Sequence, residues 1–280
     1  MNYFDAIILG AVQGITEFLP ISSSGHLVIL EDFLGLKVEE LKEFDILLHF
    51  ATLFSILIYF WKDIFKLIKL LPSWLQNCFA FAVNGFKKVE KSNNEANIIS
   101  FLIIGSIPAG ILGIFFGDII DELFRDSKMV SVMLIFSAIL FIVAEFIFKK
   151  IQKISKLNEI GLIKAFFIGT FQALALIPGV SRSGSTISAG IMSGIKREDS
   201  AKFSFFLGSI AIFGASVITL KDLDFFNNSL DLGILLAGFL SSFSFGILSI
   251  GFLMKFLKKH SLLSFSIYLI FFAGISYFFL

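Results

Sequence analysis

A carboxylate, a run of hydroxyls and an imidazole stand close together near the start of the chain. Glu17 is followed by Pro20, by three consecutive serines at positions 22 to 24 and by His26. Carboxylates and imidazoles serve as general acids and bases, and a hydroxyl beside such a base can act as a nucleophile. This grouping predicts acid–base or nucleophilic chemistry.

The passage has a second copy later in the chain. A shift of 159 positions places Gln13 on Gln172, Ser22 on Ser181, Ser24 on Ser183 and Gly25 on Gly184. Among the positions that differ between the copies, Leu176 stands at the place of Glu17, Ser185 at that of His26 and Arg182 at that of Ser23. One copy therefore carries acid–base groups and the other a permanent positive charge, a division that fits an active site better than a transport site.

The composition of the chain indicates a membrane protein. Hydrophobic residues make up 56% and charged residues 16%, with a mean hydropathy of +0.90, so too few polar side chains exist to cover a soluble surface. The net charge of +1 gives no sign of nucleic-acid binding, and the single cysteine excludes an intrachain disulfide. The elements that position the motifs must therefore be apolar helices. Six stretches are about long enough to cross roughly 30 Å of hydrocarbon, namely residues 44–61, 98–117, 129–148, 203–220, 232–254 and 261–280.

The lysines and arginines predict how these spans are threaded. They gather at residues 62–69, 87–91, 149–164, 196–202 and 255–259, and the positive-inside rule places such loops in the cytoplasm. Parity then requires residues 1–30 to begin and end outside and residues 160–196 to begin and end inside. We expect two re-entrant hairpins of opposite direction, and an interfacial amphipathic segment at residues 72–96.

We therefore predict an all-α polytopic membrane protein with about six transmembrane helices and two re-entrant hairpins in an inverted repeat. Residues 1–280 form a single membrane domain. The first repeat core is residues 1–61, with the hairpin 1–30 and the span 44–61. The second is residues 160–220, with the hairpin 160–196 and the span 203–220.

Each motif is expected to break its hairpin and to start a new helix. Proline removes a helix donor and serine caps a helix start, so the breaks fall at residues 20–22 and 178–181. Two helix N-termini would then converge on an anion. Arg182 adds a forked donor suited to phosphate, although a salt bridge to Glu17 would also explain an arginine at this depth. The hydroxyls of this anion cradle belong to Ser22, Ser23, Ser24, Ser181 and Ser183.

Other polar residues of the chain allow more than one interpretation. Gln13 and Glu17 share a helical face, and Glu17 could hold a divalent cation together with phosphate oxygens. His49 could line the site, although an ordinary packing role explains it equally well. Glu145 lies one turn from Lys149 and Lys150, which favours an interfacial ion pair.

At these motifs the chain resembles the undecaprenyl-diphosphate phosphatase, or bacitracin-resistance, family over nearly its whole length. The residues that carry the resemblance run from Gln13 to Glu17, from Pro20 to His26 and from Pro178 to Thr186. The resemblance implies removal of the terminal phosphate of undecaprenyl diphosphate, which regenerates the lipid carrier of peptidoglycan synthesis.

The resemblance also implies roles for single residues. Glu17, Ser23, His26 and Arg182 would be catalytic, with Arg182 on the phosphate. Substrate binding would involve Gln13, Ser22, Ser24, Gly25, Ser181, Ser183 and Thr186. Family members carry Gln or Glu at the place of Gln13, and Gln here weakens a two-carboxylate metal site, so Mg²⁺ or Ca²⁺ is expected on Glu17 alone, without an organic cofactor.

The expected partners are a polyprenyl diphosphate lipid and the bilayer, with no nucleic acid, and the pattern leaves a homo-oligomer open. The expected location is the bacterial cytoplasmic (inner) membrane, with the site opening to the outer face. The alternative function is a transporter or flippase for an anionic polyprenyl phosphate lipid, because inverted re-entrant hairpins are also a transporter architecture.

Overall fold

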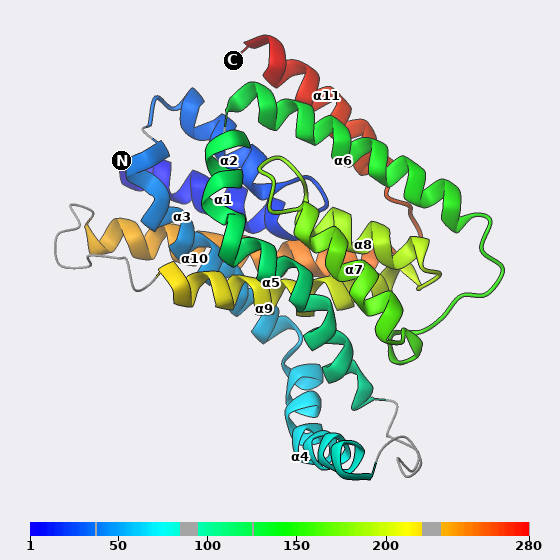
Figure 1. The fold of residues 1–280 in the computed structure, drawn as a ribbon. Coiled ribbons are helices and arrows are strands. Elements are labelled where there is room, and N and C mark those ends of the chain that lie inside the picture. Colours follow the sequence, from blue (N-terminus) through cyan, green and yellow to red (C-terminus); the bar gives the residue numbers. More distant parts are fainter. Residues whose placement is uncertain (37, 85–94, 125, 220–230, 280) are drawn as a thin grey trace.

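The computed structural model describes residues 1–36, 38–84, 95–124, 126–219 and 231–279. Within these residues the chain is helical, without a named strand, which confirms the predicted all-α class (Figure 1). The helices are α1 Tyr3–Phe18, α2 Ser23–Phe33, α3 Val38–Tyr59, α4 Trp61–Asn84, α5 Asn97–Phe124, α6 Ser127–Phe148, the 3₁₀ helix η2 Leu157–Glu159, α7 Leu162–Leu174, α8 Arg182–Met192, α9 Arg197–Thr219, α10 Leu232–Phe256 and α11 Leu263–Phe279.

The helix boundaries repeat with the same shift as the motifs. Moving α2 by 159 positions reproduces the bounds of α8, and α7 and α9 begin at the shifted starts of α1 and α3. The first two helices of each set are short. At roughly 1.5 Å per residue, neither the 11 residues of α2 nor the 11 of α8 extend across roughly 30 Å of hydrocarbon.

Long apolar helices occupy the predicted spans. α5, α6, α9 and α10 each have the length and composition to cross a membrane. The span expected at residues 44–61 ends at Tyr59, where the chain bends by 81° into α4; the two together count as a fifth candidate. The last predicted span is the shorter apolar helix α11. The chain is thus a multi-pass membrane protein.

The segment predicted to lie at the interface is partly described. Its first part belongs to α4, which projects from the body of the molecule in Figure 1. Trp74 in this part donates from Nε1 to the hydroxyl of Ser100 on α5 at 2.7 Å. Lysines 87, 88 and 91, and most of the loop between α9 and α10, lie outside the described residues.

The first short helix of each set packs on a long helix from the other half of the chain. α1 packs on α10, α7 packs on α5, and α6 pairs with α11 along the upper edge of Figure 1. Glycines that coincide under the 159 shift permit the two close crossings. A Cβ on Gly10 would lie 2.9 Å from Cβ of Ser241, and one on Gly169 would lie 2.9 Å from the carbonyl carbon of Gly105. Small residues of this kind let membrane helices approach closely.

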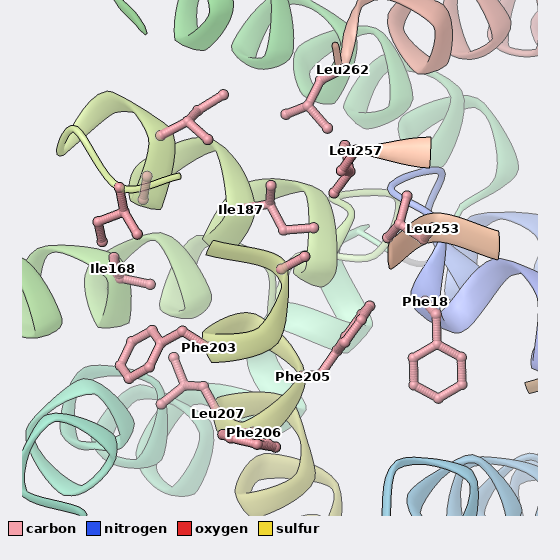
Figure 2. Packing of buried hydrophobic residues seen from close by; sticks show 14 of the residues in the cluster. Phe18, Ile168, Ile187, Phe203, Phe205, Phe206, Leu207, Leu253, Leu257 and Leu262 are labelled. Atoms are coloured by element: carbon pink, nitrogen blue, oxygen red, sulfur yellow. The ribbon is translucent and has the colours of Figure 1, made fainter. Parts of the chain in front are cut away.

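The apolar core is centred on α9. Phe203, Phe205, Phe206 and Leu207 from this helix contact side chains of surrounding helices, including Ile168 (Figure 2). Large apolar side chains on the outer faces of the long helices remain exposed to the surroundings. In a bilayer such exposed apolar faces contact lipid, so the burial pattern agrees with membrane insertion.

Glu145 forms an ion pair, as predicted, but its partner is Arg197 rather than Lys149 or Lys150. Its buried carboxylate accepts from Nε and Nη2 of Arg197, at 3.0 and 2.5 Å, and from the backbone N–H of Leu262 at 2.9 Å. Lys149 and Lys150 follow the end of α6 and are exposed. Glu145 therefore joins α6 to the start of α9 and to the approach to α11, an arrangement that neighbours in sequence could not indicate.

Candidate active site

The two polar passages form helix breaks, as predicted from their prolines and serines. α1 ends at Phe18, α2 begins at Ser23, and the Ser22 hydroxyl caps α2 by accepting from Gly25 N–H at 3.3 Å. In the second copy Ser181 caps α8 by accepting from Gly184 N–H at 3.1 Å. A helix N-terminus carries free N–H groups and a partial positive charge, so both copies present an end suited to an anion.

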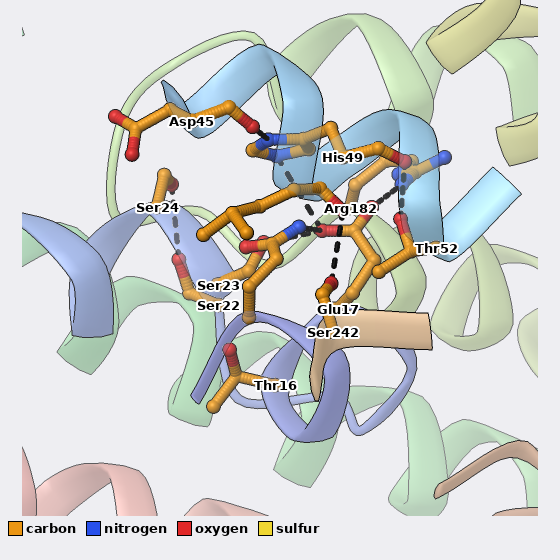
Figure 3. A network of polar contacts seen from close by, with 12 residues as sticks. Thr16, Glu17, Ser22, Ser23, Ser24, Asp45, His49, Thr52, Arg182 and Ser242 are labelled. Carbon is orange, nitrogen blue, oxygen red and sulfur yellow. Dashed lines mark hydrogen bonds and ion pairs between the residues drawn. The ribbon is translucent and has the colours of Figure 1, made fainter. Parts of the chain in front are cut away.

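The carboxylate of Glu17 is the centre of a buried polar network (Figure 3). Its Oε2 accepts from the Ser23 hydroxyl at 2.6 Å and from Nε2 of Gln13 at 2.9 Å. Its Oε1 forms an ion pair with Nη2 of Arg182. The structure thus brings together Gln13, Glu17, Ser23 and Arg182, and the ion pair considered as an alternative role for Arg182 is present.

The guanidinium of Arg182 reaches Glu17 from α8 across a glycine of α9. A Cβ on Gly208 would lie 2.9 Å from Cζ of Arg182, so a larger residue would displace the guanidinium. A small cavity of about 10 Å³, roughly the space for one water, adjoins this ion pair and is also lined by Ser183 and Ser204. The carboxylate of Glu17 therefore has a guanidinium and a little free volume beside it.

The other serines connect the two motifs. Ser183 donates to the carbonyl of Leu19 at 3.1 Å, and Ser24 accepts from the N–H of Gly179 at 3.4 Å. Thr186 is buried, donates to the carbonyl of Arg182 at 2.8 Å and lies 2.6 Å from the hydroxyl of Ser204. Ser183 of the second motif thus bonds the backbone of the first motif, and Ser24 of the first motif bonds the backbone of the second. These two hydrogen bonds hold the two helix breaks against each other.

His49 of α3 also reaches the network. Its Nδ1 lies 2.8 Å from the carbonyl of Asp45, and its Nε2 lies 3.6 Å from Oε2 of Glu17. The reading of His49 as a residue that lines the site is therefore the one that the geometry favours. The sequence signal was a histidine inside the apolar stretch that follows the first motif.

His26 is the one predicted catalytic residue that faces away from Glu17. Its Nδ1 lies 2.8 Å from the carbonyl of Ser22, and its Nε2 lies 2.8 Å from the hydroxyl of Tyr268 on α11. Its ring stacks on Phe272 with centroids 4.1 Å apart. Sequence reasoning missed Tyr268, for which the only signal was a tyrosine within the last apolar span.

The donor set can hold a divalent cation only with help from a substrate. Among the described residues, no group of three or more histidine, cysteine, aspartate and glutamate side chains could hold a metal. Mg²⁺ is nevertheless commonly held by one or two carboxylates together with phosphate oxygens and waters. Glu17 fits that sparse pattern as the single carboxylate of the network.

The arrangement is suited to attack on a phosphate group. Ser23 and Glu17 are within hydrogen-bond reach, which is the geometry of a nucleophile and its general base. Arg182 and two helix N-termini supply positive charge where phosphate oxygens would lie. Hydroxyl, base and anion-binding groups therefore come from both halves of the repeat.

Comparison with known proteins agrees with this chemistry. Residues 6–275 match the family described as bacitracin resistance protein BacA. A protein named undecaprenyl-diphosphatase from Methanosphaera stadtmanae is 41% identical over 269 residues, covering 96% of this chain and 94% of the relative. Proteins of the same name from Thermodesulfovibrio yellowstonii, at 41% over 266 residues, and Acetivibrio thermocellus, at 35% over 271 residues, cover 95% and 96% of this chain and 92% and 94% of their own lengths.

Proposed function

Because the chain belongs to the bacitracin resistance protein BacA family, we propose that it is a membrane phosphatase acting on undecaprenyl diphosphate. Water cleaves the bond between the two phosphates and yields undecaprenyl phosphate and inorganic phosphate. The product is the lipid carrier in the form used again for peptidoglycan synthesis. The observation that carries this proposal is the hydrogen bond of 2.6 Å between the Ser23 hydroxyl and Glu17, beside Arg182.

In the first half of the proposed reaction, Oγ of Ser23 attacks the terminal phosphorus. The Ser23 proton passes to Oε2 of Glu17, and the bond from phosphorus to the bridging oxygen breaks. Undecaprenyl phosphate leaves with that oxygen and takes the proton from Glu17. The products of this half are a phosphoserine at Ser23 and a restored carboxylate at Glu17.

In the second half, water attacks the phosphoserine. Glu17 accepts the proton of the water and returns it to Oγ of Ser23 as the serine–phosphorus bond breaks, so inorganic phosphate is released. This assignment uses Glu17 as the base for Ser23, because both nitrogens of His26 are engaged elsewhere. A water that attacks the diphosphate directly, with Glu17 as its base, is the competing pathway.

Arg182 is proposed to bind the terminal phosphate, with the N-termini of α2 and α8 and their serines around it. Ser22, Ser24, Gly25, Ser181 and Ser183 belong to these ends, whereas Gln13 orients Glu17 and Thr186 supports α8. When a divalent cation is bound by Glu17 and phosphate oxygens, it neutralises charge on the substrate.

The helix lengths support two re-entrant hairpins, α1–α2 and α7–α8, in an inverted repeat. Their short helices, their common cap and the exchanged packing on α10 and α5 are features that such a repeat requires. We place the protein in the cytoplasmic membrane with the head-group site open to its outer face. The apolar tail would lie between helices at the lipid-facing surface.

The test uses purified protein in detergent, where no gradient or second compartment exists. The wild type is expected to release phosphate from a polyprenyl diphosphate, and Ser23→Ala is expected to release none and to form no phosphoserine. A phosphoserine trapped by acid quenching and mapped to Ser23 supports the covalent pathway, and full activity of Ser23→Ala would refute it. Absence of release by the wild type would instead favour the transporter.

A further inference from the structure

His26 is held by groups on two different helices. One is the carbonyl of Ser22, in the same turn as His26, and the other is the hydroxyl of Tyr268 on α11, 242 positions away in sequence. The imidazole is also stacked on Phe272 with an interplanar angle of 1°. A ring that is fixed at both nitrogens and on one face has a single orientation.

These contacts determine where the ring proton lies. A backbone carbonyl can only accept a hydrogen bond, so Nδ1 of His26 must carry the hydrogen that Ser22 receives. None of Ser22, Tyr268 and Phe272 bears a negative charge that would stabilise an imidazolium. In the neutral ring Nε2 is then an acceptor, and the hydroxyl of Tyr268 donates to it.

The same contacts hold an unusual backbone in place. Ser22 has φ of 70°, and no other non-glycine residue of the described chain has a positive φ. Its counterpart Ser181 has φ of −66°. The position of His26 is occupied in the second copy by Ser185, whose buried hydroxyl has no hydrogen-bond partner among the described residues. The strained backbone thus occurs only in the copy that has an imidazole to bind its carbonyl.

We propose that Tyr268 is a positioning residue for the reaction of Ser23, and this inference depends on the proposed phosphatase function. Its hydroxyl fixes His26 as the Nδ1–H tautomer, the Nδ1–H holds the carbonyl of Ser22, and Ser22 sets the start of α2 where Ser23 meets Glu17. α11 thereby controls the geometry of the nucleophile without touching the substrate.

The tautomer can be tested by ¹⁵N NMR of protein labelled at histidine, because the chain contains only three histidines. The signal of His26 is assigned by its loss in His26→Asn. We expect a protonated Nδ1 and an unprotonated Nε2 in the wild type. In Tyr268→Phe, which keeps the aromatic ring but removes the donor, we expect the Nε2 signal to shift and the tautomers to mix.

Kinetics provide the second readout. Tyr268→Phe is expected to lower kcat about tenfold, the loss that one hydrogen bond can produce, with KM within about twofold of the wild type because substrate binding is not involved. Tyr277→Phe is the matched control on α11, since Tyr277 is exposed and its ring makes an edge-to-face contact with its neighbour Phe278. It should change neither the His26 spectrum nor kcat.

Phe272→Leu distinguishes the effect of the Tyr268 hydroxyl on His26 from the effect of the stacked ring. It removes the ring beside His26 but leaves the donor, so the Nδ1–H tautomer should persist. An unchanged His26 spectrum in Tyr268→Phe, or an equal loss of the tautomer in Phe272→Leu, would overturn the proposal. The spectra require no turnover, so a wild type that releases no phosphate would refute the function while the assignment of Tyr268 to His26 is still judged on its own evidence.

Discussion

Replacement of Ser22 by glycine should separate the backbone strain in the first copy of the motif from the ordinary cost of losing a capping serine. Ser22 and Ser181 are matched residues, because each caps a short helix through the N–H three positions later. Only Ser22 has a left-handed φ, of 70° against −66°. Ser181→Gly is therefore a control within the same chain.

The magnitude follows from three contributions to the free energy of unfolding. A residue held in a sparsely populated backbone region costs about 1–3 kcal/mol, which glycine at position 22 would relieve. Glycine adds about 0.5–1 kcal/mol of conformational entropy to the unfolded chain and weakens the cap by a few tenths of a kcal/mol. Ser22→Gly should thus be neutral or stabilising by up to about 2 kcal/mol, whereas Ser181→Gly should be destabilising by about 1 kcal/mol.

The assay is reversible unfolding in mixed detergent micelles, followed by far-ultraviolet circular dichroism. Tryptophan fluorescence is unsuitable, because Trp61 and Trp74 both lie in α4 and report mainly on that helix. The informative quantity is the difference between the two variants, expected to be about 1–3 kcal/mol in favour of Ser22→Gly. Equal destabilisation by both substitutions would show that the left-handed backbone of Ser22 stores no strain, and the reasoning would fail.

Three further predictions concern the helix crossing, the buried ion pair and the cation. Gly169→Ala should destabilise the protein by about 1–3 kcal/mol, because its Cβ would meet the backbone of Gly105, while Gly110→Ala on the same partner helix has open space and should be neutral in the same unfolding assay. Arg182→Ala should lower phosphate release at least about 100-fold and destabilise the protein by about 3–5 kcal/mol by leaving Glu17 unpaired; adding Glu17→Gln should restore stability but not activity, and recovery of activity would contradict the assigned roles. Chelation with EDTA should abolish phosphate release and Mg²⁺ or Ca²⁺ should restore it, whereas undiminished release in EDTA would remove the cation from the proposal.

Local signals allowed the parts of the site that lie within one motif to be predicted. Proline, serine and glycine determine a helix break within a few residues, so the starts of α2 and α8 and the Gln13–Glu17 contact followed from spacing. The all-α class and the apolar spans followed from hydropathy, which is summed over many residues and tolerates local error.

Contacts between distant helices could not be predicted in the same way. The partner of Glu145 is Arg197 rather than a neighbouring lysine, and the partner of His26 is Tyr268. Membrane helices are apolar on every face, so no periodic pattern shows which side turns inward. The bend of 81° after Tyr59 likewise could not be predicted, because no proline or glycine stands beside it in the sequence.

The first short helix of each half packs on a long helix of the other half, and this has a consequence for how the protein is made. α1, which carries Glu17, packs on α10, and α10 begins at Leu232. A ribosome that has completed the first 160 residues has therefore made α1 with Glu17, but not the helix α10 on which α1 packs. If the proposed function holds, hydrolytic capacity should arise only late in synthesis, after α10 and α11 have entered the bilayer. Two separately expressed halves should be inert alone and gain activity only when they assemble in the same membrane.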